Sequence, residues 1–416
     1  IIFWLSQALS QLGSSMTTFA LILWTYTQKG TAMTVSLMTF FNYLPYIILS
    51  LFVGTFVDNH SKKKIMLVSD SIAAICSLAI FCLNSGNALQ IWHIYLVNMI
   101  IGFMGAFQDP ASDVALGKVV PKEKLEQISG MNSFSDNLVA VLSPVFAAFL
   151  FAFGGLKLIL IIDLSSFLFA FLILLFVLRI PDDIPQKAEK KSVFIGCKEG
   201  LQYLKQHNGI FLVIITMAVL NFFSRLTYEN ILSPMILSRS ANDSVTLGIV
   251  NAVMGIGGII GGIIVSSGKI KANSAKMIYL SAMLSFLLGD IMMGLGRNGI
   301  VWSLAGLAAS LPIPFINAGQ MVILYRNVPE DMKGRIFAVR NAVQFSSIPL
   351  GILLGGLLAD YVFEPFMLTQ NPITQVLHKL VGEGAGSGMA VMFLCTGILG
   401  SLFSFAFYQR KDIRNL

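Results

Sequence analysis

Residues 54–64, which read GTFVDNHSKKK, decide the fold, because they place a short charged turn between two long apolar stretches. Gly54 lets two helix ends approach closely, and Asp58 follows one helical turn later on the same face. The lysines at 62–64 then hold the turn on the cytoplasmic side of a bilayer, since cytoplasmic loops are enriched in Lys and Arg. This stretch therefore predicts a tight, oriented loop between two transmembrane helices.

The composition is that of a polytopic membrane protein. Hydrophobic residues make up 56% of the chain and charged residues 12%, whereas a soluble domain carries about 25% charged residues. A helix of about twenty apolar residues crosses a bilayer. Twelve such stretches are predicted, near 1–27, 33–57, 65–84, 89–115, 126–152, 155–179, 209–238, 243–267, 274–294, 299–327, 334–363 and 388–409.

The net charge of +7 follows from membrane topology. Of the 28 Lys and Arg residues, five lie in loops on one side of the membrane and two lie inside spans, which leaves 21 for the opposite side. By the positive-inside rule, both termini are expected in the cytoplasm. No nucleic-acid partner is expected, because the positive charge needs no other explanation.

The chain is predicted to consist of two bundles of six helices joined by a linker. Residues 180–208 form the long polar stretch, and their apolar positions at helical spacing predict an amphipathic helix on the cytoplasmic surface. This linker separates an N-terminal bundle, 1–179, from a C-terminal bundle, 209–416. A shift of 208 residues places Gly54 on Gly262, and such a parallel repeat is found in one large class of transporters. The predicted fold class is thus an all-α membrane protein.

The loop at 54–64 resembles the signature of the major facilitator superfamily. That signature reads Gly-x-x-x-Asp-basic-x-Gly-basic-basic, and Gly54, Asp58, Lys62 and Lys63 fill its main positions. The resemblance implies the twelve-helix fold of that family and transport by alternating access, with no cofactor.

Other segments extend the resemblance over the whole chain. Ser143-Pro144 looks like a reduced form of the family's Gly-Pro motif in the fifth span, and Gly334-Arg335 opens the eleventh span in a similar way. The chain most resembles bacterial drug exporters of the macrolide-efflux type. The fourth-span Arg of many proton-coupled members is absent, and Asn98 lies where it would be sought. Asn98 is predicted to line the substrate cavity.

The resemblance implies a cytoplasmic gate at the signature loop. Asp58, with Gly54, Lys62 and Lys63 around it, would cap the eleventh helix near Gly334 and Arg335 in the outward-facing state. A carboxylate is stabilised at the positive end of a helix dipole, which makes this contact physically sensible. The alternative is that Asp58 is a solvated loop residue.

The first span carries a stripe of polar side chains. Gln7, Gln11, Ser14 and Thr18 recur at spacings of four, three and four, so they share one helix face. Lipid cannot satisfy such a stripe, and by resemblance spans 1, 4, 7 and 10 line the central cavity. We expect this face to line the substrate cavity; the alternative is hydrogen bonding between helices.

The seventh span carries Asn221, Arg225 and Glu229 at successive steps of four. An unpaired Arg in mid-membrane costs several kcal/mol, on the order of 3, and Glu229 one turn away is its natural partner. Asn221 and the pair are predicted to face the substrate cavity, where the pair binds polar substrate groups or breaks on protonation, with Glu229 as proton carrier. The alternative is a permanent pair that holds the helix against a neighbour.

Five further acids lie inside the spans. Asp136, near the centre of the fifth span, is the second candidate for proton coupling, and Asp109 in the fourth span is expected to line the cavity. Asp70, Asp163 and Asp290 lie off the helices that the resemblance assigns to the cavity. They are expected to be structural or interfacial.

Prolines in two spans predict bent helices. Pro312 and Pro314 in the tenth span remove backbone donors, as Pro144 beside Ser143 does in the fifth. Asn317 and Gln320 follow in the tenth span and are predicted to line the cavity.

The predicted function is export of a small amphiphilic or hydrophobic compound, drug-like or macrolide-like, in exchange for protons. The expected partners are this small molecule, protons and the lipid bilayer. The chain is expected to act as a monomer in the cytoplasmic (inner) membrane of a bacterium. The alternatives are a siderophore, a peptide-like natural product, a lipid or a nutrient as cargo, or a non-transporting receptor.

An enzyme is not expected. The four His residues all lie at or near predicted loops, and no nucleotide-binding loop or paired nucleophile is present in the sequence. The four Cys residues lack metal-ligand spacing, so neither a metal nor a cofactor is expected.

Overall fold

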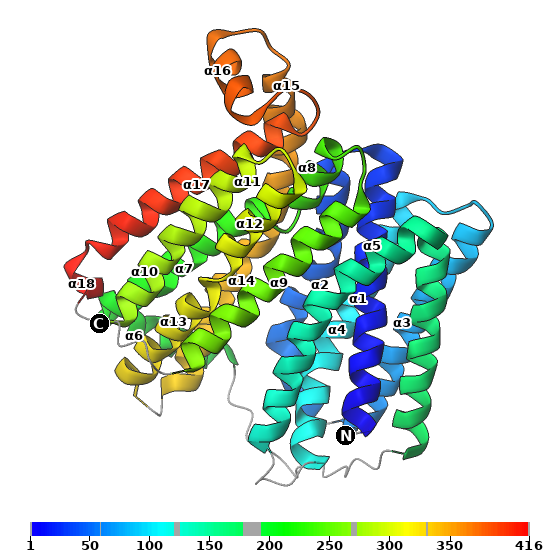
Figure 1. Ribbon diagram of the computed structural model, residues 1–416. Coiled ribbons are helices and arrows are strands. Elements are labelled where there is room, and N and C mark those ends of the chain that lie inside the picture. Colours follow the sequence, from blue (N-terminus) through cyan, green and yellow to red (C-terminus); the bar gives the residue numbers. More distant parts are fainter. Residues whose placement is uncertain are drawn as a thin grey trace. The chain divides into compact units, whose positions relative to one another are not determined.

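The computed structural model describes residues 2–58, 60–119, 125–177, 193–267, 273–329 and 332–414, which fold into helices joined by short connections (Figure 1). The chain divides into two compact units. Unit 1 comprises 1–30 and 37–189, and unit 2 comprises 31–36 and 190–416.

Unit 1 is a bundle of long helices. α1 packs along α5, and α3 packs against both α4 and α5. Their close approach depends on small residues, which lipid-embedded helices use where backbones meet. A Cβ on Gly102 of α4 would lie 1.9 Å from the carbonyl oxygen of Asn42 on α2, so only glycine fits there. The helices are α1 (Ile2–Lys29), α2 (Ala32–Asp58), α3 (Lys62–Ser85), α4 (Ile91–Val119), α5 (Leu125–Leu172) and the π-helix η2 (Ile173–Val177).

α5 crosses the membrane twice. Its backbone leaves the helical region at Gly155, with φ 59° and ψ −162°, a conformation that glycine adopts without strain. The apolar stretch Ser135–Phe176 is 42 residues long, so it would extend about 63 Å as one helix, twice the bilayer core. The reversal at Gly155 therefore separates the fifth and sixth spans, as the sequence predicted.

The described residues contain twelve membrane-crossing helices. Ten stretches are long and apolar enough to cross a membrane. The stretch at Ser135–Phe176 holds two spans, and α1 adds one more, although its polar stripe lowers its hydropathy. The predicted all-α membrane fold is confirmed.

Unit 2 contains more and shorter helices, because several of its spans are interrupted. α14 packs along α7, α12 packs on α9, and α17 packs on α10. The helices are α6 (Val193–Gln206), α7 (Asn208–Thr227), α8 (Leu232–Arg239), α9 (Ser244–Ser266), α10 (Ser274–Leu284), η3 (Ser285–Asp290), α11 (Ile291–Leu295), α12 (Gly299–Ser310), α13 (Ile313–Asn327), α14 (Lys333–Leu358), η5 (Ala359–Phe363), α15 (Glu364–Met367), α16 (Pro372–Val381), α17 (Ser387–Tyr408) and α18 (Lys411–Arg414).

Two of these interruptions divide predicted spans. The span predicted at 209–238 is broken by a turn at 228–231, between α7 and α8. The span predicted at 299–327 is broken at Leu311 and Pro312, between α12 and α13. By contrast, α5 continues through Pro144.

The first turn of α2 packs within unit 2. Its unpaired backbone donors, Ala32 N and Met33 N, bond to the carboxylate of Asp360 on η5 at 3.1 and 2.7 Å. Asn230 Nδ2 donates to Ser36 Oγ on the next turn at 3.0 Å. Asp360 thus caps α2 from a distant part of the chain, where a negative charge is favourable.

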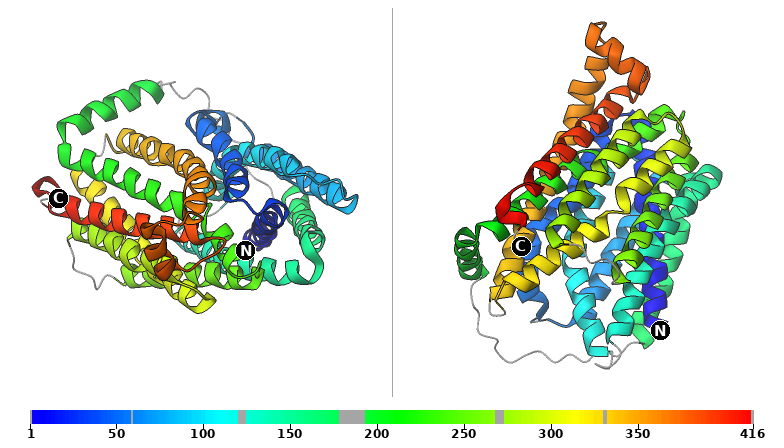
Figure 2. Two further views of the ribbon diagram at one scale, coloured as in Figure 1. Left: turned by 90° about the horizontal axis from the view of Figure 1, so that it is seen from above. Right: turned by 60° about the vertical axis from the view of Figure 1, so that its left-hand side comes forward.

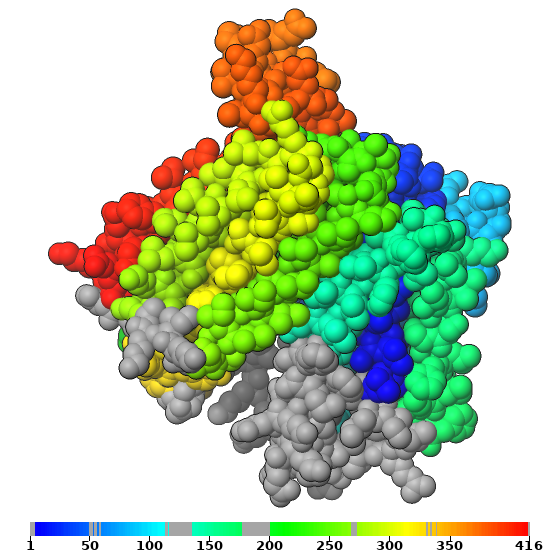
Figure 3. Space-filling model, viewed as in Figure 1, coloured from blue at the N-terminus to red at the C-terminus, as the bar shows by residue number. Residues whose placement is uncertain are grey.

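α6 lies crosswise to the long helices of unit 2 (Figure 2). Leu204 on its inner face is fully buried, and Gly200 approaches the carbonyl oxygen of Arg335 on α14. The linker predicted at 180–208 falls partly outside the described residues, so its boundaries stay a prediction. At the other end of unit 2, α15 and α16 project from the bundle (Figure 3, orange).

Candidate functional site

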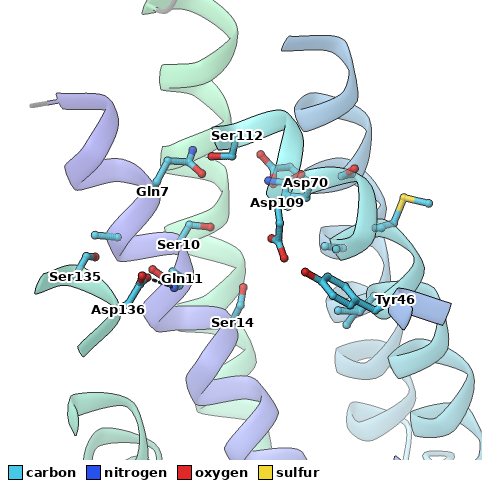
Figure 4. A pocket seen from close by; sticks show the side chains of 17 residues that line it. Gln7, Ser10, Gln11, Ser14, Tyr46, Asp70, Asp109, Ser112, Ser135 and Asp136 are labelled. Carbon is cyan, nitrogen blue, oxygen red and sulfur yellow. Dashed lines mark hydrogen bonds between the residues drawn. The ribbon is translucent and has the colours of Figure 1, made fainter. Parts of the chain in front are cut away.

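Unit 1 contains a polar cavity of about 720 Å³ among α1 to α5 (Figure 4). This volume lies within the range of small-molecule pockets, about 300–1,000 Å³. Its walls are formed by Gln7, Ala8, Ser10, Gln11, Ser14, Tyr46, Ser69, Asp70, Ala73, Ile101, Met104, Gly105, Gln108, Asp109, Ser112, Ser135 and Asp136.

α1 supplies one wall because of its helical spacing. Gln7, Ser10, Gln11 and Ser14 lie at i, i+3, i+4 and i+7, so all four face the same side of the helix and line the cavity. The polar residues predicted to share a face of this helix therefore face the cavity and not lipid.

Carboxylates stand on two sides of the cavity. Asp136 on α5 is exposed, and it accepts a hydrogen bond from Gln11 Nε2 at 3.0 Å. Asp109 on α4 is also exposed. Asp70 on α3 is half-buried, and it accepts a hydrogen bond from Gln108 Nε2 at 2.7 Å. The lining has no Lys, Arg or His among the described residues, so the cavity is acidic.

A buried carboxylate joins three spans of unit 1. Asp163, 4% exposed, accepts hydrogen bonds from Thr17 at 3.0 Å and Ser14 at 3.2 Å on α1. It also accepts one from Ser77 on α3 at 3.0 Å. These three hydroxyls satisfy the carboxylate and fix α1 relative to the sixth span.

Unit 2 carries its polar groups in a different arrangement. Arg225 and Glu229 form an ion pair at the end of α7, with 28% and 32% of their side chains exposed. Asn221, one turn earlier, is half-buried. A Cβ on Gly351 would lie 2.9 Å from Arg225 Cβ, so α14 packs closely beside the pair.

A second buried carboxylate joins three spans of unit 2. Asp290, 1% exposed, ends the π-helix η3. It accepts hydrogen bonds from Tyr228 Oη at 2.9 Å and from Thr396 Oγ1 on α17 at 2.7 Å. Tyr228 directly precedes Glu229, so this contact anchors the broken end of α7.

The structure brings five of the predicted site residues into one cavity: Gln7, Gln11, Ser14, Asp109 and Asp136. Asn98 lies elsewhere in unit 1. It is 4% exposed, and its Nδ2 donates to the carbonyl oxygen of Ile94 in its own helix at 2.9 Å. The other predicted cavity residues lie in unit 2, where Asn317 is exposed and Gln320 is 5% exposed.

Part of the predicted gate can be placed. Gly54 and Asp58 lie in the last turns of α2, but the side chain of Asp58 is outside the described part of the structure. Lys62 is 2% exposed, and Lys63 Nζ donates to the carbonyl oxygen of Leu175 at 3.0 Å. The role of Asp58 as a gate contact therefore stays a prediction.

The rest of the gate and the predicted bends lie on long helices. Gly334 and Arg335 belong to the first turn of α14, and an Arg335 nitrogen lies 3.2 Å from Met332 Sδ. Ser143 is buried within α5, and Pro314 follows the interruption between α12 and α13.

Sequence reasoning missed several cavity residues. Asp70 was expected to be structural, yet it lines the cavity with Gln108, Tyr46 and Ser112. Its position between Ser69 and Ser71 in a predicted span was a usable signal, since an acid in a membrane span faces protein or water. Among the described residues, no group of three or more His, Cys, Asp or Glu could hold a metal ion.

The helix arrangement and the cavity agree with the comparison to known families. The family model described as Major Facilitator Superfamily matches residues 3–352. The chain belongs to the major facilitator superfamily. It is accordingly a multi-pass membrane transporter of a family that acts on small molecules.

Relatives within the superfamily include efflux proteins. Macrolide efflux protein A of Streptococcus pyogenes is 26% identical over 365 residues, covering 86% of this chain and 89% of that protein. The Staphyloferrin A transporter of Staphylococcus aureus is 23% identical over 365 residues, covering 86% and 89%. A solved structure, a bacterial homologue of the iron transporter ferroportin in an inward-facing state, has a TM-score of 0.72, 14% identity and 98% coverage of both chains. This likeness shows the fold alone.

Proposed function

We propose that this superfamily member exports small amphiphilic or hydrophobic compounds by alternating access, in exchange for protons. The observation that carries the proposal is the acidic cavity of about 720 Å³ in unit 1. It is large enough for a drug-sized molecule, and its polar groups can orient one. The relatives named for macrolide efflux support outward transport of such molecules.

For proton coupling, Asp136 is the stronger of the two candidates. It is exposed in the cavity, where its structural partner is the neutral amide of Gln11. Glu229, in contrast, is paired with Arg225, which stabilises its charged form. A carboxylate without a cationic partner can exchange a proton with little change in helix packing.

The proposal also includes the orientation of the protein in the membrane and its oligomeric state. Both termini lie in the cytoplasm, in the inner membrane of a bacterium, and the transporter acts as a monomer. The loop at 54–64 closes the cytoplasmic side by capping α14. The charge distribution along the sequence supports this orientation.

The proposal is tested in proteoliposomes that contain the purified protein. A pH gradient is expected to drive a macrolide against its concentration gradient, and addition of the macrolide is expected to dissipate the pH gradient. Empty liposomes are the control for passive leakage. If neither flux responds to the other for any compound of a broad panel, the proposed antiport is wrong.

A further inference from the structure

Helix α16, in the segment that projects from unit 2 (Figure 3, orange), is bonded to residues that end membrane spans. His378 Nε2 donates to the carbonyl oxygen of Met367 at 2.9 Å, and Met367 is the last residue of one apolar span. The guanidinium of Arg239 donates to the carbonyl oxygen of Val381, and Arg239 is the last residue of another. Two spans thus end at residues that hold α16.

A third contact fixes the same end of α16. Arg297 Nη2 donates to the carbonyl oxygen of Lys379 at 2.8 Å, and Arg297 closely follows Leu295, where a third span ends. After α16 the chain leads to Ser387, where the span formed by α17 begins. Because a spanning helix ends at the surface of the bilayer, these contacts place α16 beside that surface.

α16 is a short helix that depends on capping. It has 10 residues, and isolated helices shorter than about 12–15 residues are marginal in water. Asn371 accepts hydrogen bonds from the N–H groups of Ile373 and Thr374, and Thr374 Oγ1 accepts one from Asn371 N, which makes a capping box. The two arginine contacts satisfy carbonyl groups at the other end of the helix. α16 is therefore a preformed surface whose side chains have defined directions.

The side chains of α16 divide into three faces. Thr374 and Val381 are buried, and Gln375 and Lys379 are exposed on a polar face. The apolar side chains that are exposed lie at spacings of three and four residues and share one face. They are Ile373, Val376 and Leu380. A helix with separate apolar and polar exposed faces is typical of helices that lie in a membrane interface.

Two further observations favour phospholipid as the neighbour of this apolar face. Exposed apolar side chains lead to it from the adjoining span, among them Tyr361 and Leu368, and Tyr is enriched at membrane interfaces. Residues 365–382 contain no Asp or Glu, and Lys379 and Arg297 are exposed at the C-terminal end of α16. Lipid phosphate groups attract such cations, while the acyl chains below them accommodate apolar side chains.

We propose that α16 is an interfacial helix that binds the phospholipid surface of the surrounding bilayer. Ile373, Val376 and Leu380 insert at the boundary between headgroups and acyl chains, and Lys379 and Arg297 contact lipid phosphate groups. This surface is separate from the cavity of unit 1, so it depends neither on the cargo nor on proton coupling. It anchors one end of unit 2 to the membrane surface.

The test measures what surrounds the apolar face. In full-length protein whose four native Cys residues are replaced by Ala, single labelling sites are introduced by Ile373→Cys and by the matched control Gln375→Cys on the polar face. Leu402→Cys, at an exposed position within the span of α17, supplies the signal of a label in lipid. Each site receives a nitrobenzoxadiazole fluorophore, and the protein is reconstituted in phosphatidylcholine nanodiscs. Quenching is measured with a phospholipid that carries a nitroxide near the top of its acyl chain, and separately with iodide in the water.

The label at position 373 is expected to be quenched by the nitroxide lipid at least about twofold more than the label at position 375, and by iodide at most about half as much. Equal quenching of both labels by each agent would show that the apolar face lies in water, which overturns the proposal. Shielding of position 373 from both quenchers overturns it as well, because protein would then cover the face.

A second measurement uses the unaltered protein and therefore does not depend on the folding of a variant. Nanodiscs are prepared with a phospholipid that carries a photoreactive diazirine near the top of its acyl chain, and adducts are located by mass spectrometry after irradiation. Adducts are expected within residues 373–380. Their absence from this segment, with adducts present on α17, would contradict the proposal.

Discussion

α1 in unit 1 and α7 in unit 2 carry polar side chains at similar spacing, but their charges are satisfied in different ways. Gln11 of α1 reaches across to Asp136 on α5, and the resulting pair lines an acidic cavity. At the end of α7, Arg225 pairs with Glu229 in the turn that follows the helix. Asp136 of unit 1 therefore has a neutral amide as its partner among the described residues, whereas Glu229 of unit 2 is paired with a cation one helical turn away.

This difference suggests a division of labour between the units. Asp136 lines a cavity whose described lining residues include no Lys, Arg or His, whereas the ion pair of unit 2 lies at the interrupted end of α7. Both units share a structural device, because Asp163 and Asp290 each join three spans through hydroxyl donors. The following predictions test where the two units differ and where they agree.

The largest effect is expected for Asp136→Asn. If Asp136 exchanges the proton, a pH gradient should no longer drive accumulation of cargo in proteoliposomes, with a loss of about 100-fold. Exchange of labelled for unlabelled cargo without a gradient should be reduced much less. Asp243→Asn is the control, and gradient-driven uptake by Asp136→Asn at the unaltered rate would remove Asp136 from the coupling mechanism.

The second-largest effect is expected on protein stability, when either of the two buried carboxylates is removed. Asp163→Ala and Asp290→Ala each leave buried hydroxyls without an acceptor, so each should lower the free energy of unfolding by about 2–3 kcal/mol. Denaturant titration in mixed micelles measures this change. Ser165→Ala is the control, since Ser165 is exposed and bonds the carbonyl oxygen of Ile161 on its own helix. If both aspartate variants match this control, the carboxylates do not join the spans.

A smaller effect is expected for the ion pair. Arg225→Met or Glu229→Gln alone should destabilise unit 2 by about 1–2 kcal/mol, because each leaves one charge unpaired. The expected loss is smaller than for a fully buried ion pair, because about a third of each side chain is exposed. The double variant should be more stable than Arg225→Met, and a double-mutant cycle of unfolding free energies measures the coupling. Additive losses would show that the pair contributes nothing.

How far the sequence predicts this arrangement can be seen in individual residues. The stripe on α1 followed from spacing alone, because polar groups four residues apart share a face and cannot meet lipid. The sequence did not predict that Asp70 lines the cavity. Which helices face Asp70 depends on packing between segments that lie far apart in the sequence. The interruption at 228–231 contains neither Gly nor Pro, so no local signal marked it. Pro144 and Pro312 both lie within predicted spans. The helix continues through Pro144 and is interrupted at Pro312.

The smallest effect is expected at the first turn of α2. Asp360→Ala removes the acceptor for two backbone N–H groups, and loss of a helix cap costs about 1 kcal/mol. Amide hydrogen exchange at Ala32 and Met33 should become faster, by about fivefold. Exchange in α9, whose cap is Asp243, should stay unchanged. Unaltered exchange at Ala32 and Met33 would contradict the capping role.

The most direct test of the proton-coupling role of Asp136 is proton movement during transport. A labelled macrolide is allowed to move across the membrane of proteoliposomes, and the protons that move with it are counted with a trapped pH indicator dye. The unaltered protein and Glu229→Gln are expected to move protons with the cargo, while Asp136→Asn moves far fewer. The role of Asp136 is contradicted if Asp136→Asn moves as many protons as the unaltered protein and Glu229→Gln moves none.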